Sequence, residues 1–248
     1  MNRGQLRVYL GAAPGVGTTC AMLQEGHRLA DGGRDVVIGF VETHGRAATA
    51  AAAVGLAVIP RPPMVGGRVV CDVMDVEAVL AAEPDVVLVD DLARVAVDGL
   101  GRVRRHRDLD VLLDVGIDVL TTLDVRQLES VSDVSEAITG IRLPDTVPDH
   151  VVRAADQIQL VDLPPEQLRA RLADGLLYPP DDVDARMSTL FRGANLAALR
   201  EITLLWLADR VDEHVATLRA ERGITDAWEI RERVLVSLTG TPDDDRVL

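Results

Sequence analysis

The stretch GAAPGVGTT, residues 11–19, follows the apolar segment LRVYLGA (6–12) and precedes the helical pattern TTCAMLQEGHRLADGG (18–33). Four of its residues approximate the phosphate-binding pattern G-x-x-x-x-G-K-[ST]: Gly11, Pro14, Gly15 and Gly17. A strand, a glycine-rich turn and a helix in this order predict an α/β domain in which N–H groups at the helix start point towards an anion. We therefore interpret residues 11–19 as a degenerate phosphate-binding loop, called the glycine loop below.

The glycine loop lacks the lysine of the pattern, because Thr18 stands in its place. The chain contains no lysine at all, so its 26 Lys and Arg positions are all arginine. The missing charge-assisted contact is worth about 1.5–3 kcal/mol, roughly one to two decades in affinity. The rest of the loop does not depend on that lysine, so seven residues are candidates for phosphate binding: Gly11, Pro14, Gly15, Val16, Gly17, Thr18 and Thr19. The alternative is an ordinary glycine turn without a ligand.

Two acidic residues end a later apolar segment, VVLVDD (86–91). An acid at the end of such a strand holds Mg²⁺ in nucleotide hydrolases, with help from the hydroxyl residue of the loop. We therefore expect Asp90 and Thr19 to be metal ligands, and we expect Asp91 to stand in the position of a water-activating acid.

Polar residues also follow the predicted strand that ends in FVETHGR (40–46). The carboxyl ends of the strands line the ligand crevice of a doubly wound sheet. Four side chains are then expected to face this crevice: Glu42, Thr43, His44 and Arg46. The alternative is a polar turn that starts the alanine-rich helix of residues 45–55.

Apolar segments alternate with helical patterns over the first part of the chain. Predicted strands cover residues 6–12, 35–42, 57–60, 84–91, 116–125 and 157–163, and predicted helices between them cover 18–33, 45–55, 76–83, 102–115 and 127–140. Strands that are apolar on both faces and separated by helices indicate a parallel sheet covered on both sides. We predict an α/β domain over residues 1–163, with a doubly wound, mostly parallel sheet of about five strands that is P-loop NTPase-like.

The character of the chain changes to helices after Pro164. We predict a C-terminal helical subdomain over residues 164–222, whose longest helix (193–222) carries an apolar stripe. That stripe belongs either to the core or to a contact with a partner helix, such as a second copy of the chain in a homodimer. Residues 223–248 are predicted to be a linker and the first strand of a further domain.

Composition argues against several classes of partner. A net charge of −14 repels the phosphates of nucleic acid and an anionic membrane surface. The two cysteines and five histidines show no metal-binding spacing. No basic-apolar leader is present, and the apolar stretch ITLLWLA (202–208) is too short to span a bilayer. We expect a cytoplasmic protein.

Several segments together make a closer match. They are GAAPGVGTTCAMLQEGHRL (11–29), VVIGFVETHGRAAT (36–49), VVLVDDLA (86–93), LLDVGIDVLTTLDV (112–125), LESVSDVSEAITG (128–140), TVPDHVVRAADQIQLVDLPPEQLRARLADG (146–175) and FRGANLAALREITLLWLADRVDEHV (191–215). Over residues 5 to about 218 the chain resembles the N-terminal cytoplasmic domain of the KdpD family of osmosensitive, potassium-responsive sensor histidine kinases. The tail RVLVSLTGTP (233–242) looks like the start of the universal-stress-type domain that follows in that family.

The departures from the family concern polar residues at the expected strand ends. The family has lysine where Thr18 stands, Asp-Glu where this chain has Asp90-Asp91, and Asn where this chain has Asp124. Asp124 near phosphates would be repulsive unless Mg²⁺ or Arg126 offsets its charge. The pattern predicts a domain that folds like the sensor module but has weakened chemistry.

The resemblance implies a regulatory sensor module of a potassium or osmotic two-component system, which binds ATP or ADP with Mg²⁺ weakly and performs no kinase chemistry itself. Its partners would be the remainder of a sensor kinase or a response regulator pathway, with membrane contact only through that partner and no nucleic acid. Two alternatives stay open. The first is a small NTPase that uses Arg46, Arg94 or Arg126 in place of the loop lysine, and the second is a purely structural interaction domain.

Overall fold

The computed structural model describes residues 2–61, 73–97 and 102–222. The chain divides into two compact units, Met1–Ala208 and Asp209–Leu248. The sheet and the helices around it belong to the first unit. The predicted linker and strand at 223–248 lie outside the described residues. The division at residues 163 and 222 stays a prediction.

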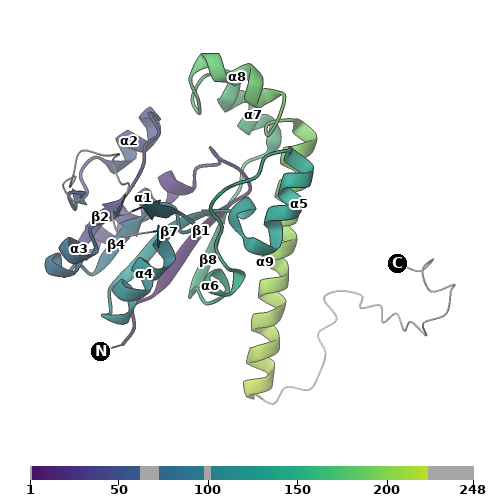
Figure 1. Ribbon diagram of the computed structural model, residues 1–248. Coiled ribbons are helices and arrows are strands. Elements are labelled where there is room, and N and C mark those ends of the chain that lie inside the picture. Colours follow the sequence, from purple (N-terminus) through teal and green to yellow (C-terminus); the bar gives the residue numbers. More distant parts are fainter. Residues whose placement is uncertain (1, 62–72, 98–101, 223–248) are drawn as a thin grey trace. The chain divides into compact units, whose positions relative to one another are not determined.

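The first unit is built on a six-stranded, all-parallel sheet, which confirms the predicted doubly wound α/β class (Figure 1). Its strand order is β3-β2-β4-β7-β1-β8. The bounds are β1 (Leu6–Gly11), β2 (Val36–Phe40), β3 (Ala57–Val58), β4 (Val86–Val89), β7 (Asp118–Asp124) and β8 (Gln157–Val161). The connection after β1 runs to β2 on one side, and the connection after β7 passes β1 to reach β8 on the other side. The carboxyl ends of the adjacent strands β1 and β7 are therefore the topological switch point where such sheets bind ligands.

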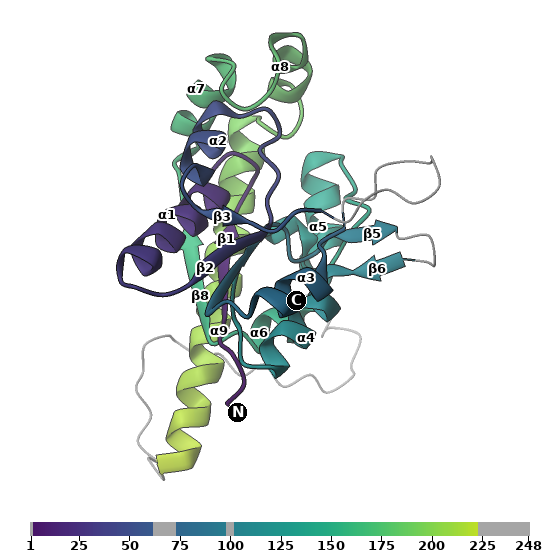
Figure 2. The ribbon, with the colours of Figure 1, turned by 90° about the vertical axis from the view of Figure 1, so that its left-hand side faces the viewer.

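Helices connect the strands, and the alternating pattern predicts all of them except α6. They are α1 (Thr18–Asp31), α2 (Ala47–Ala53), α3 (Val76–Ala82), α4 (Arg105–Asp114), α5 (Glu129–Thr139) and α6 (Asp149–Arg153). α1 begins directly after the left-handed Gly17 and ends at Gly32, which precedes the left-handed Gly33. Figure 2 shows α1 on one side of the sheet and α3 and α4 on the other.

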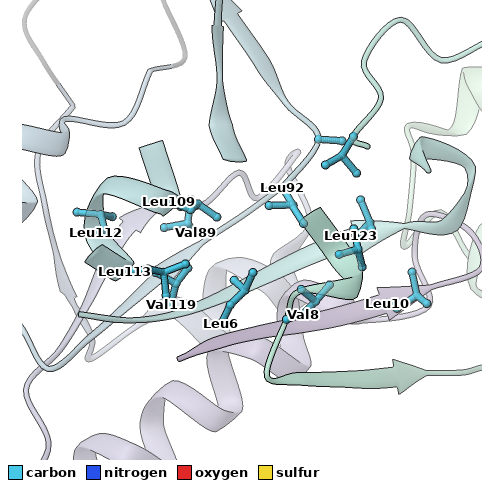
Figure 3. Packing of buried hydrophobic residues seen from close by; sticks show 14 of the residues in the cluster. Leu6, Val8, Leu10, Val89, Leu92, Leu109, Leu112, Leu113, Val119 and Leu123 are labelled. Carbon is cyan, nitrogen blue, oxygen red and sulfur yellow. The ribbon is translucent and has the colours of Figure 1, made fainter. Parts of the chain in front are cut away.

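Alternate residues of the strands enter two cores, one on each face of the sheet. Along β1, Leu6, Val8 and Leu10 belong to the core under α3, α4 and α5, the cluster that also contains Leu112 (Figure 3). Tyr9 belongs to the core under α1. Because both faces are buried, the strands are apolar at nearly every position, as is typical of parallel sheets.

Three further helices follow the sheet: α7 (Pro165–Ala173), α8 (Pro180–Met187) and α9 (Gly193–Arg222). α7 and α8 both have proline in the first turn, where the missing N–H costs nothing. Buried residues of α7 and the first turns of α9 form a third apolar cluster with Val16 of the glycine loop. In the described part of the chain, no helix is both long and apolar enough to cross a bilayer.

One prediction about the middle of the chain is wrong. Residues 102–115 were expected to be one helix, but Arg102–Arg104 form a strand, β6, and α4 begins at Arg105. β6 pairs antiparallel with β5 (Val95–Val97), so a tertiary backbone pairing overrides the local helical pattern. The sequence also did not predict α6 or the short 3₁₀ helix η1 (Val125–Gln127).

Replacing Leu112 by alanine tests the core under α4. Leu112 has no exposed surface, whereas its neighbour Val111 is 46% exposed on the same helix. Leu112→Ala should lower the free energy of unfolding by about 2–5 kcal/mol, because it removes buried methyl groups and leaves a cavity. Val111→Ala is the matched control and should change it by less than about 1 kcal/mol. If urea denaturation showed the same loss of unfolding free energy for both variants, the assignment of Leu112 to the buried face of α4 and of Val111 to its exposed face would be contradicted.

Candidate functional site

A pocket of about 540 Å³ lies at the carboxyl ends of the central strands. Most of its walls come from three places in the chain: the glycine loop, the residues that follow β2 and β4 and end β7, and the segment that runs from the α7–α8 connection into α8. The first two were expected from the sequence to meet at one edge of the sheet. The third was not expected.

The backbone of the glycine loop is left-handed at two positions, with φ of 89° at Gly15 and 110° at Gly17. Only glycine adopts these angles readily. The backbone N–H groups of residues 13, 15 and 17–20 donate no hydrogen bond to any acceptor in the part of the chain that the structure describes. Since these groups surround the start of α1, they form a concentration of unsatisfied donors beside the pocket.

The spacing of the loop differs from the phosphate-binding pattern in more than the lysine. Five residues, not four, separate Gly11 from Gly17, so Ala12 occupies the position of the first glycine of the pattern. Gly11 ends β1, and a Cβ atom there would come within 2.6 Å of Val16. Gly11 is therefore required for close packing. Val16 itself is buried in the apolar cluster with α7 and α9, so only its backbone is available to a ligand.

Asp90 and Thr19 lie together, as predicted. The Thr19 hydroxyl donates to the two carboxylate oxygens of Asp90 at 3.3 and 3.2 Å, and the Thr122 hydroxyl of β7 donates to the same carboxylate. Burial raises the pKa of Asp90 above its ordinary value, and these hydrogen bonds only partly oppose that rise. No cationic side chain of the described residues forms an ion pair with Asp90.

Mg²⁺ fits this arrangement, because it prefers oxygen ligands and commonly takes only one or two carboxylates, with water and substrate phosphates as further ligands. Asp90 and Thr19 would hold the ion, and the ion would supply positive charge to neighbouring phosphate groups. The described residues contain no group of three or more His, Cys, Asp or Glu side chains able to hold a metal by themselves. Phosphate oxygens would therefore have to complete the coordination.

Asp91 lies in the same pocket, but its carboxylate is held by the protein. It has a left-handed φ of 59°, and it accepts hydrogen bonds from the backbone N–H of Ala93 at 3.1 Å and from the Gln127 side chain at 2.8 Å. Burial raises its pKa to about 6, and the nearby charge of Asp90 adds to the rise. The carboxylate therefore titrates close to neutral pH.

Arg126 is the residue that offsets Asp124. Its guanidinium donates to both carboxylate oxygens of Asp124, Nε at 2.9 Å and Nη2 at 2.8 Å. Burial alone would lower the pKa of Arg126, but the Asp124 carboxylate raises it overall. The same carboxylate caps η1 by accepting from the Arg126 backbone N–H. The charges at the end of β7 are thus neutralised within the protein.

The arginines proposed to replace the loop lysine have different surroundings. Arg94 donates to Glu42 at 2.6 Å and does not line the pocket. Arg126 lines the pocket but is occupied by Asp124. Arg46 lines the pocket, as does His44, whereas Glu42 and Thr43 do not. Of the polar residues after β2, the crevice therefore receives His44 and Arg46.

Sequence reasoning missed several residues of the pocket: Thr122, Leu177, Tyr178 and Arg186. A signal existed for two of them. Thr122 belongs to a pair of threonines in the middle of β7, DVLTTLD, between apolar residues of a buried strand. Tyr178 is one of only six Phe, Trp and Tyr residues in the chain. It lies in the segment LLYPP (176–180), whose two prolines do not suit the interior of a helix or strand. Nothing local pointed to Arg186.

Comparison with known proteins yields one consistent family. Residues 2–211 match the family described as the KdpD osmosensitive K⁺ channel His kinase sensor domain. The chain is 50% identical to Sensor protein KdpD of Mycobacterium tuberculosis over 99% of its own length and 29% of that protein. It is 44% identical to Sensor protein KdpD of Escherichia coli K12 over 96% of its own length and 26% of that protein. The chain thus spans less than a third of these relatives.

Changing Asp91 to Asn should alter how stability depends on pH. Because its folded-state pKa of about 6 lies above the ordinary value of 3.8, ionisation of Asp91 costs the folded state stability as the pH rises from about 4 to 6. The unfolding free energy of Asp91→Asn minus that of the wild type should therefore increase by about 1.5 kcal/mol between pH 5 and pH 8.

Urea denaturation at the two pH values measures this difference. Asp133→Asn is a suitable control, because Asp133 is exposed on α5. The control should show no comparable change with pH. A flat difference for Asp91→Asn would show that its carboxylate is not destabilised in the folded protein.

Arg126→Gln should destabilise the protein by about 3 kcal/mol, because it leaves the Asp124 carboxylate partly buried without its partner. The double variant Arg126→Gln/Asp124→Asn should recover part of that loss. Arg142→Gln serves as the control, since Arg142 is 73% exposed in its pair with Glu136 and should matter by less than about 1 kcal/mol. Thermal unfolding of the wild type, of these three variants and of Asp124→Asn alone measures the coupling; strict additivity at 124 and 126 would refute it.

Proposed function

The chain belongs to the family of KdpD osmosensitive K⁺ channel His kinase sensor domains, and from this membership we propose that it is the regulatory sensor module of a two-component system responding to potassium or osmotic state. Its relatives carry the name Sensor protein KdpD and are more than three times as long. The signal would therefore be passed to kinase chemistry located in a partner or in further protein sequence.

The module would bind ATP or ADP with Mg²⁺ in the pocket at the end of β1. The observation that carries this proposal is the set of N–H groups at residues 13, 15 and 17–20, which have no acceptor among the described residues and lie beside the Thr19–Asp90 pair. Phosphate oxygens would accept from the N–H groups, since a helix start combines open donors with a positive dipole end. Mg²⁺ at Asp90 would at the same time compensate a buried carboxylate that has no cationic partner among those residues.

Binding would be weak, because Thr18 cannot provide the charge of the missing lysine. A dissociation constant on the order of 0.1–1 mM is consistent with the loss of one such contact. Weak binding suits a regulatory role. The nucleotide would shift the balance between two conformations by the difference in its affinity for them, without being consumed.

Hydrolysis is the second candidate function, and the surroundings of the arginines argue against it. Two of the three arginines that could stabilise a transition state, Arg94 and Arg126, are occupied by Glu42 and Asp124. Asp91 is held by two hydrogen bonds from the protein. Arg46 is the remaining candidate, so turnover that depends on Arg46 and Asp90 would favour the enzyme.

The partners would be the kinase part of a sensor protein and, through it, a response regulator pathway. The chain would reach the membrane only indirectly, through that kinase part. A homodimer formed along α9 belongs to the same proposal, since two sensor modules would then act together.

Titration calorimetry with Mg-ADP and Mg-ATP tests nucleotide binding. The wild type should bind with millimolar to sub-millimolar affinity and gain thermal stability in proportion to ligand concentration. Thr18→Lys should bind about ten-fold more tightly or better, because it restores a charge-assisted contact. Thr19→Val should lose most of the benefit of Mg²⁺, whereas Thr43→Val, which lies outside the pocket, should not.

Two results would overturn the proposal. The first is the absence of heat and of thermal shift for both the wild type and Thr18→Lys at millimolar ligand, which would leave a structural interaction domain. The second is binding that is unchanged in Thr19→Val and independent of Mg²⁺, which would place the nucleotide elsewhere.

A further inference from the structure

Four basic side chains line the pocket: His44, Arg46, Arg126 and Arg186. Arg126 is neutralised by Asp124, so it has no charge to offer a ligand. Arg46 differs, because the described residues place no carboxylate within ion-pair distance of it. Its Nε donates to the backbone carbonyl of Leu177 at 3.2 Å, while its two Nη groups donate to no described residue. The guanidinium therefore brings an uncompensated positive charge and open donors to the pocket.

The position of Arg46 is determined by the connection between α7 and α8. Besides the carbonyl of Leu177, the ring of Tyr178 contacts it, with the Cζ atom of Arg46 lying 5.5 Å from the ring centroid. The guanidinium of Arg186 lies over the same ring at 3.6 Å. Two cationic groups thus meet at one aromatic ring on the pocket wall.

The same connection contacts the glycine loop. Arg171 of α7 donates to the carbonyl of Gly15 at 3.1 Å, and the Leu177 side chain lies so close that a Cβ atom on Gly15 would come within 2.6 Å of it. Val16 packs with Leu177 in the apolar cluster that also contains the first turns of α9. The residues that hold Arg46 and the residues that hold the glycine loop are therefore parts of one packed structure.

We propose that Arg46, held by Leu177 and Tyr178, takes the place of the missing loop lysine and binds the terminal phosphate of a nucleoside di- or triphosphate. The proposal rests on nucleotide binding by the glycine loop and adds the residue that supplies the charge. The ligand is then bound jointly by the loop and the α7–α8 connection. A nucleoside monophosphate would gain much less, because it has no terminal phosphate beyond the one in the loop.

A double-mutant cycle at positions 18 and 46 tests this assignment, with Mg-ADP as the probe in titration calorimetry. In the wild type, Arg46→Gln should weaken Mg-ADP binding about ten-fold or more, as expected for a charge-assisted contact. In the Thr18→Lys background the same change should weaken binding by less than about three-fold, because the lysine supplies the charge. With AMP as the probe, Arg46→Gln should have little effect in either background.

Arg142→Gln is the matched control, since Arg142 is an exposed arginine outside the pocket and should leave binding unchanged. Arg46→Lys keeps the charge and should retain more affinity than Arg46→Gln. Tyr178→Leu should weaken Mg-ADP binding in the wild type and much less in Thr18→Lys, which a merely structural role of the ring would not produce. Thermal unfolding of each variant shows whether it is folded.

The outcomes separate the two proposals. Wild-type protein that binds no Mg-ADP at millimolar concentration would overturn nucleotide binding itself. Wild-type protein that binds Mg-ADP equally well after Arg46→Gln would overturn only the assignment of Arg46. An equal loss for Arg46→Gln in both backgrounds would also overturn it, because Arg46 would then act independently of the lysine position.

Discussion

The left-handed backbone at Gly15 and Gly17 is the constraint on which the pocket depends. A side chain at either position would strain the turn, and at Gly15 it would also collide with Leu177. The turn sends the side chain of Val16 into the apolar cluster of the C-terminal helices while the N–H groups around it stay without acceptors in the described structure. The packing of Val16 in this apolar cluster therefore fixes the conformation of the loop. Thr18, which stands in the place of the lysine, is not a member of that cluster.

Burial and pairing decide which charges of the pocket are available. Asp124 and Arg126 neutralise one another and cap η1, so they act as structure. Asp90 and Asp91 have raised pKa values because they are buried without a cationic partner among the described residues. A divalent cation would gain most at such carboxylates, and phosphates would gain most at the loop N–H groups. On the proposal above, these would be the complementary places for the two components of a Mg-nucleotide.

The α7–α8 connection closes one wall of this pocket and belongs to the same apolar cluster as the first turns of α9. A ligand bound to both the glycine loop and this connection would favour the conformations in which the two are in contact. Regulation by occupancy needs no more than such a difference in affinity between conformations. On the proposal above, a bound nucleotide would act in this way on the contact between the glycine loop and the first turns of α9.

Local sequence determined the alternation of buried strands and helices, the glycine turn before α1, and Asp90 at a strand end, because each depends on residues a few positions apart.

Only the tertiary structure decided the rest. β7 lies between β1 and β4 and brings Thr122 to Asp90, 32 residues away, while α7 brings Arg171 to Gly15, 156 residues away. The pairing of β5 with β6 replaced the first turn of a predicted helix. Ion pairs with Glu42 and Asp124 occupied two of the three candidate arginines and left Arg46 facing the pocket. Contacts between residues this far apart arise when strands and helices pack, and a pattern read along the chain has no access to them.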